Sequence, residues 1–192
     1  MKKTLKFKDT PFGLIIAEYD ESPLSVFAFF VVAAVIAIAL FAPFFSPQDP
    51  YDLPKLDLLD GNLAPMSESF TGSIYYLGTD DMGRDMLSAI LYGLRTSLGV
   101  GVTSGLMAFT IGTVIGLLAA YYRGKFETLL MRIVDLQLSF PAMLIALVLL
   151  VVLGQGVEKI IIALVIVHWA YFARAARGAA LSERNKEYLE AA

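Results

Sequence analysis

The sequence predicts an all-α, polytopic membrane protein with four transmembrane helices and one amphipathic helix at the membrane interface. Of its 192 residues, 57% are hydrophobic and 17% are charged, and the mean hydropathy is +0.68. Such a composition is typical of a membrane protein and not of a soluble domain. Residues 22–48, 96–122 and 136–157 contain no Asp, Glu, Lys or Arg. Because a bilayer core of about 30 Å requires about 20 helical residues, each of these stretches can hold one span.

A fourth span is predicted from a shorter uncharged stretch, residues 160–173. Lys159 and Arg174 flank it, and their long side chains can reach the interface and lengthen the span. The spans divide the chain into an N-terminal segment (1–23), a first transmembrane helix (24–45), an outer loop (46–95) and the start of a transmembrane domain (96–192).

The distribution of basic residues predicts the orientation. The inner segments carry eleven Lys and Arg residues and the outer segments carry four. The positive-inside rule therefore places the N-terminus in the cytoplasm and residues 46–95 outside. The first span is too long for the core of a signal peptide, so we expect it to stay uncleaved. The overall charge of −3 comes from the acidic outer loop and indicates no nucleic-acid partner.

The amphipathic helix is predicted at the end of the outer loop. Thr79 or Asp80 is a suitable N-cap, and Asp80 and Arg84 are spaced as a favourable helical pair. Apolar residues then recur at helical spacing until Arg95, where we expect this helix to end. By itself the pattern indicates a capped helix that lies in the membrane interface.

The second span carries four glycines, Gly101, Gly105, Gly112 and Gly116. Eleven residues are almost three whole turns, so all four lie on one face of the helix. Such a face lets another helix approach closely in lipid, and the sequence leaves open whether that helix belongs to this chain.

The third span, residues 136–153, contains Pro141 near its start. This proline either kinks the span or lies in the first turn of a helix that begins near Ser139. After the fourth span, Ser182 is a candidate N-cap for a further, cytoplasmic helix.

Several chemistries are disfavoured. No Asp, Glu, Lys or Arg lies well inside a span, which argues against a proton-coupled carrier or a voltage sensor. The chain has no Walker A loop, dinucleotide fingerprint, HExxH or GxSxG motif, so we expect no enzyme activity and no cofactor. With one histidine, His168, and no cysteine, we expect no metal site.

Several stretches together resemble a known family. These are LGTDDMGRDMLS at 77–88, YGLRTSLGVG at 92–101, IGTVIGLLAAYYRG at 111–124, LLMRIVDLQLSFPAMLIAL at 129–147 and WAYFARAARGAALSERNKEYLEAA at 169–192. They are similar to the membrane permease subunits of ATP-binding-cassette importers for dipeptides, oligopeptides and nickel. Within that group the chain resembles the C-type partner of the permease heterodimer.

The resemblance implies roles for two sets of residues. The family motif LGTDxxGRD falls on Leu77, Gly78, Thr79, Asp80, Gly83, Arg84 and Asp85, and the EAA motif falls on Glu190, Ala191 and Ala192. In relatives the EAA motif opens a cytoplasmic coupling helix that docks on the ATPase. The resemblance also implies a bacterial inner-membrane location, a second permease, separate ATPase subunits and an external substrate-binding protein.

Relatives continue through two further spans, so we expect this chain to be truncated at the EAA motif. A structural or assembly subunit that transports nothing is the alternative, because the coupling loop is incomplete and the spans lack polar groups.

Overall fold

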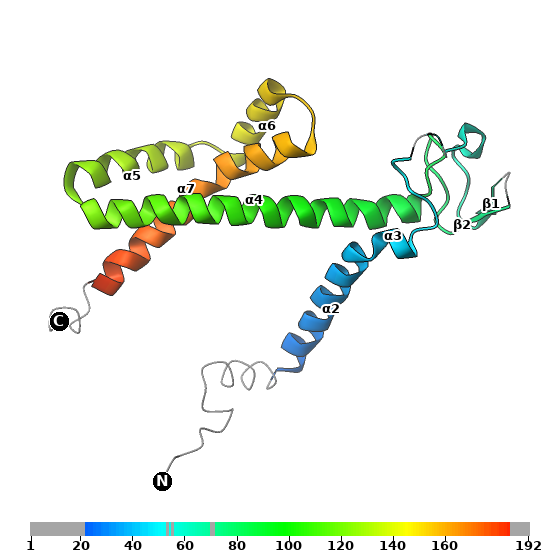
Figure 1. Ribbon diagram of the computed structural model, residues 1–192, viewed down its shortest axis with the longest axis horizontal. Coiled ribbons are helices and arrows are strands. Elements are labelled where there is room, and N and C mark those ends of the chain that lie inside the picture. The colour runs from blue at the N-terminus through cyan, green and yellow to red at the C-terminus, as the bar shows by residue number, and fades with distance from the viewer. Residues whose placement is uncertain (1–21, 53, 55, 70–71, 185–192) are drawn as a thin grey trace, which may run out of the picture. The chain divides into compact units, whose positions relative to one another are not determined.

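The computed structural model describes residues 22–52, 54, 56–69 and 72–184. Helices account for most of this part of the chain, and the two strands form one short antiparallel hairpin (Figure 1). The elements in order are α2 (Pro23–Leu40), α3 (Ala42–Phe45), the 3-10 turn η3 (Leu58–Asp60), β1 (Ser67–Glu68), β2 (Ile74–Tyr75), α4 (Met86–Tyr122), α5 (Gly124–Ser139), α6 (Ala142–Leu153) and α7 (Val157–Arg184).

The prediction of an all-α, polytopic membrane protein is confirmed. Helices α2, α4 and α7 are each long and apolar enough to cross a membrane, and α5 with α6 makes a fourth candidate if this bent pair counts as one span. The chain divides into two compact units, Met1–Leu98 and Gly99–Ala192, with the boundary inside α4.

In the first unit, the predicted span 24–45 is divided at Phe41 into α2 and α3. Pro43 has no backbone N–H to bond to the carbonyl four residues earlier, so the α2 ladder cannot continue through it. Pro23 stands in the first turn of α2, where a missing N–H costs nothing.

The prediction of an amphipathic helix that begins near Thr79 or Asp80 and ends at Arg95 was wrong at both ends. Residues 77–85 form a folded loop, and α4 begins at Met86. Asp85 is the N-cap, because its carboxylate accepts the backbone N–H of Ser88 at 2.8 Å. Helix α4 contains no proline, so its ladder continues past Arg95 into the second span and ends at Tyr122. At 37 residues α4 is about 55 Å long, more than a bilayer core requires.

The third predicted span, residues 136–153, is broken near its start. Instead of one helix, α5 and α6 are bent by 89° at a break that contains Phe140 and Pro141. Phe140 is extended, with φ −92° and ψ 142°, as a residue before proline prefers. Pro141 precedes the first residue of α6. The chain therefore bends at this proline, as the first alternative predicted, but at a break between two helices and not within one helix.

Helix α7 is longer than the predicted span 160–173. It continues to Arg184, so Ser182 lies inside it and does not cap a new helix. The buried centre of the second unit is formed by Val134 of α5 with Ala170 and Ala173 of α7, and Trp169 packs against this cluster. Small residues dominate because they let the helix backbones approach closely.

Candidate functional site

The Leu77–Asp85 motif folds around the Asp80 carboxylate. Its Oδ1 accepts the backbone N–H groups of Met82 and Arg84 at 2.9 and 3.0 Å, and its Oδ2 accepts Arg84 Nε at 2.7 Å. The predicted Asp80–Arg84 pair is therefore present, but on a turn and not on a helix. Burial opposes the ionised carboxylate, but the bonds from Arg84 and Met82 outweigh it and lower the pKa of Asp80.

Thr79 ties this motif to the preceding part of the loop. Its hydroxyl donates to the Asp60 carbonyl and accepts the Leu63 N–H at 2.8 Å, while its own N–H donates to the Leu63 carbonyl at 3.1 Å. Two glycines make this close approach possible. Gly78 and Gly83 have φ of 76° and 73°, and a Cβ on either one would overlap the backbone of Leu63 or Asp57.

The last motif residue, Asp85, forms a hydrogen-bond network with Gln48 and Ser88. Asp85 is 1% exposed, and its Oδ2 also accepts the Ser88 hydroxyl at 2.5 Å. The Asp85 N–H donates to Gln48 Oε1 at 2.9 Å, and the Gln48 N–H donates to Ser88 Oγ at 3.2 Å. This network joins the chain just after α3 to the first turn of α4. The role of Gln48 could not be predicted from the sequence, because no local pattern relates it to Asp85, which lies 37 positions later.

Tyr75 provides a third buried contact within the loop. Its hydroxyl donates to Asp60 Oδ2 at 3.0 Å. Burial, this hydrogen bond and the charges of Asp60, Asp85 and Asp57 raise the pKa of Tyr75 to about 12.

These bonds give the motif an architectural role. Every side chain described above is held by groups of the same loop or of its flanking helix ends, and only Asp85 Oδ1 is buried without a hydrogen-bond partner among the described residues. No group of three or more His, Asp or Glu residues in the described ranges is arranged to hold a metal ion. The loop is therefore suited to fixing helix ends.

In the second unit, only two of the four predicted glycines contact α7. A Cβ on Gly112 would lie 2.6 Å from Phe172 Cβ, and one on Gly116 would lie 2.9 Å from Ala176 Cβ. A Cβ on Gly101 or Gly105 would meet no described atom within 4 Å. The four glycines share one face of α4, but α7 crosses that face only in the C-terminal half of α4. The close partner is thus a helix of this chain for Gly112 and Gly116.

Two ion pairs join α5 to α7. Glu127 Oε1 lies 2.7 Å from Arg177 Nε, and Asp135 pairs with Arg174. The sequence predicted Arg174 as a flanking, inner basic residue of the span, and no local pattern predicted either pair.

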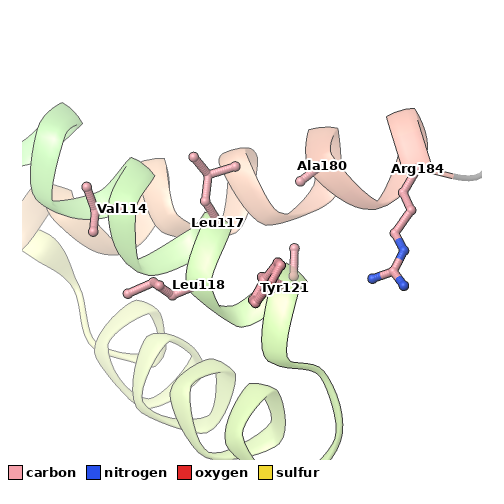
Figure 2. Close-up of a pocket in the computed structure, with 7 residues that line it drawn as sticks. Val114, Leu117, Leu118, Tyr121, Ala180 and Arg184 are labelled. Atoms are coloured by element: carbon pink, nitrogen blue, oxygen red, sulfur yellow. The ribbon is translucent and has the colours of Figure 1, made fainter. Parts of the chain in front are cut away.

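An open apolar groove of about 540 Å³ lies between the C-terminal halves of α4 and α7 (Figure 2). Arg184 is the one charged residue among those that line it, and Tyr121 stands at the same end. The complete lining is Val114, Leu117, Leu118, Ala120, Tyr121, Ala180 and Arg184.

Comparison with known proteins identifies the family. Residues 112–192 match the family described as binding-protein-dependent transport system inner membrane component. Residues 10–65 match the N-terminal transmembrane domain of oligopeptide transport permease C. The chain belongs to the permease family of peptide and nickel ABC importers.

Named relatives fit this family. The chain is 33% identical over 169 residues to a dipeptide transport system permease of Bacillus subtilis, covering 88% of this chain and 50% of the relative. It is 35% identical over 183 residues to a glutathione transport system permease of Pectobacterium atrosepticum, covering 95% and 58%. A nickel transport system permease of Escherichia coli is 33% identical over 162 residues, covering 84% and 55%. The chain thus spans about half the length of the curated relatives it matches.

Glu190, Ala191 and Ala192 lie outside the described residues, and their predicted coupling role stays a prediction. The residues 77–85 of the other family motif are brought together in one loop, as the hydrogen bonds above describe.

Proposed function

We propose that the chain forms the membrane-spanning part of a permease subunit in an ATP-binding-cassette importer. The substrate would be a peptide or a similar small solute, because the named relatives are dipeptide, oligopeptide, glutathione and nickel permeases. The observation that carries the proposal is the match of both ends of the chain, residues 10–65 and 112–192, to importer permease families.

In this proposal the chain transports and does not catalyse. It forms the translocation path with a second permease, an external binding protein delivers the solute, and separate ATPase subunits hydrolyse ATP. The N-terminus lies in the cytoplasm of a bacterial cell, which the eleven-to-four distribution of Lys and Arg supports. Residues 77–85 then lie outside and Glu190–Ala192 inside.

Reconstitution tests the function. The full product of the gene is expressed with the permease, ATPase and binding protein encoded beside it, and the purified complex is placed in liposomes. We expect ATP-dependent uptake of a labelled dipeptide, glutathione or nickel chelate. A complex that assembles but neither takes up any of these solutes nor hydrolyses ATP faster with the binding protein would favour the alternative, a subunit that does not transport.

Glu190 tests the coupling role within the same complex. A carboxylate bonded to a charged partner at a desolvated contact contributes about 1.5–3 kcal/mol, so we expect Glu190→Ala to weaken ATPase binding by about 10- to 150-fold. Glu187→Ala removes a nearby glutamate and serves as the matched control. Equal ATPase binding and uptake in both variants would contradict the assignment of Glu190 to coupling.

A further inference from the structure

Three helices of the second unit meet at one turn of α7, residues 173–177. Helix α4 reaches this turn through Gly116, where a Cβ would lie 3.0 Å from the Arg177 backbone nitrogen. Helix α5 reaches it through Glu127, which pairs with the Arg177 guanidinium. Ala173, in the same turn, is fully buried with Val134 of α5. We call residues 173–177 of α7, together with Gly116 and Glu127, the α7 junction.

The contacts at the α7 junction differ in what they can fix. The contact of Gly116 and Ala173 sets how closely α4 and α7 approach, because no side chain separates the backbones. Small residues also leave a smooth surface, so this contact offers little resistance to rotation or sliding of α7 against α4. Arg177 Nε donates to Glu127 Oε1 at 2.7 Å, and Arg177 Nη2 lies 2.5 Å from the same oxygen. This directed, charged contact fixes the rotation of α7 against α5.

The neighbouring pair, Arg174 with Asp135, offers a comparison within the same two helices. The side chains of Arg177 and Glu127 are 34% and 18% exposed, whereas those of Arg174 and Asp135 are 53% and 61% exposed. Water and salt screen the more exposed pair more strongly, so it contributes less to holding the helices. Removal of one partner from the less exposed pair leaves the other charge poorly solvated.

We propose that the Glu127–Arg177 ion pair positions the C-terminal end of α7 for coupling to ATP hydrolysis. This inference rests on the proposed function. Helix α7 runs on from Arg177 to Arg184, and Glu190 follows six positions later in the sequence. Because α7 is continuous over this distance, a rotation at the α7 junction is carried to Arg184. Glu127 and Arg177 act as positioning residues, because they contact each other and act on coupling through α7.

Charge reversal in the reconstituted importer tests this inference. Glu127→Arg, Arg177→Glu, the double reversal and, as the matched control, Asp135→Arg are compared for solute taken up per ATP hydrolysed. We expect each single reversal at the α7 junction to lower this ratio at least about 5-fold, the lower end of typical coupling between sites. The double reversal should restore the ratio to within about twofold of the parent, as a pairwise interaction requires. Asp135→Arg should leave it within the same limits.

Copurification of the ATPase separates positioning from folding. We expect equal amounts of bound ATPase in all variants, since the pair positions α7 and does not build the complex. Single reversals with the parent's ratio would overturn the inference, and so would loss of bound ATPase that the double reversal fails to restore. A parent complex that neither transports nor shows stimulated ATP hydrolysis would refute the proposed function and this inference with it. An active parent with unaffected variants would refute the inference alone.

Discussion

The substitution Gly116→Ala should destabilise the second unit, although alanine is the better helix former. The new Cβ would lie 2.9 Å from Ala176 Cβ and would overlap the Ala173 carbonyl, whereas ordinary contacts begin at 3.4 Å. The overlap with the Ala173 carbonyl is the larger of the two, so helices α4 and α7 must separate by about 1 Å. A gap of about 0.5–1 Å already forfeits a quarter to a half of the dispersion energy of the atoms concerned.

The magnitude follows from two opposing effects. Overpacking at a close contact costs about 1–3 kcal/mol. Replacing a helical glycine by alanine gains up to about 1 kcal/mol, because the unfolded chain has less freedom to lose. We expect a net loss of about 1–2 kcal/mol in the free energy of unfolding.

Gly105→Ala is the matched control, on the same helix and with the same gain in backbone preference. A Cβ at Gly105 meets no described atom within 4 Å, so this variant should be unchanged or stabilised by up to about 1 kcal/mol. Unfolding in mixed detergent and SDS micelles can be followed by the fluorescence of Trp169, the single tryptophan, which packs against the buried cluster. Equal midpoints for the two variants, or a higher midpoint for Gly116→Ala, would refute the packing argument.

Three further outcomes are expected in the first unit and in the topology. Asp85→Ala removes the N-cap of α4 and should cost about 0.5–2 kcal/mol, measured as about 2- to 30-fold faster hydrogen exchange in the first turn of α4; the exposed Asp81→Ala should change exchange there by less than about twofold. Because the pKa of Tyr75 is raised to about 12, its contribution to stability is complete below pH of about 10 and is lost as the pH rises toward 12. The ultraviolet titration of the nine tyrosines should therefore contain one late component that Tyr75→Phe removes, and a titration unchanged by that substitution would contradict the burial argument. Single cysteines at Ser67 and Ser182 should react with an impermeant thiol reagent from outside and only after permeabilisation, respectively, and the reverse pattern would contradict the orientation.

Three of the four predicted spans lie within the long helices α2 with α3, α4 and α7, and this agreement has a simple physical reason. A bilayer accepts only long, uncharged helices, so composition alone places α2, α4 and α7. The acid-rich stretch before α4 likewise indicated a helix start nearby, since a carboxylate cap is a local device. Asp80 and Arg84 could form their pair on a turn as well as on a helix, and sequence spacing alone did not separate the two.

Tertiary contacts decided the rest, because the deciding atoms come from distant parts of the chain. Gly78 and Gly83 adopt backbone conformations that exclude a helix only because Leu63 and Asp57 pack against them. The start of α4 at Met86 follows from this packing.

In the second unit, too, the sequence predicted the helix faces and the tertiary contacts decided which residues meet. The sequence placed four glycines on one face of α4, but the crossing position of α7 selected Gly112 and Gly116 as its contacts. Glu127 and Arg177 are 50 positions apart, so no periodicity relates them. Only the packing of α5 on α7 brings the two charges together. Local chemistry determined which segments are helical and apolar, and long-range packing determined which of their residues meet.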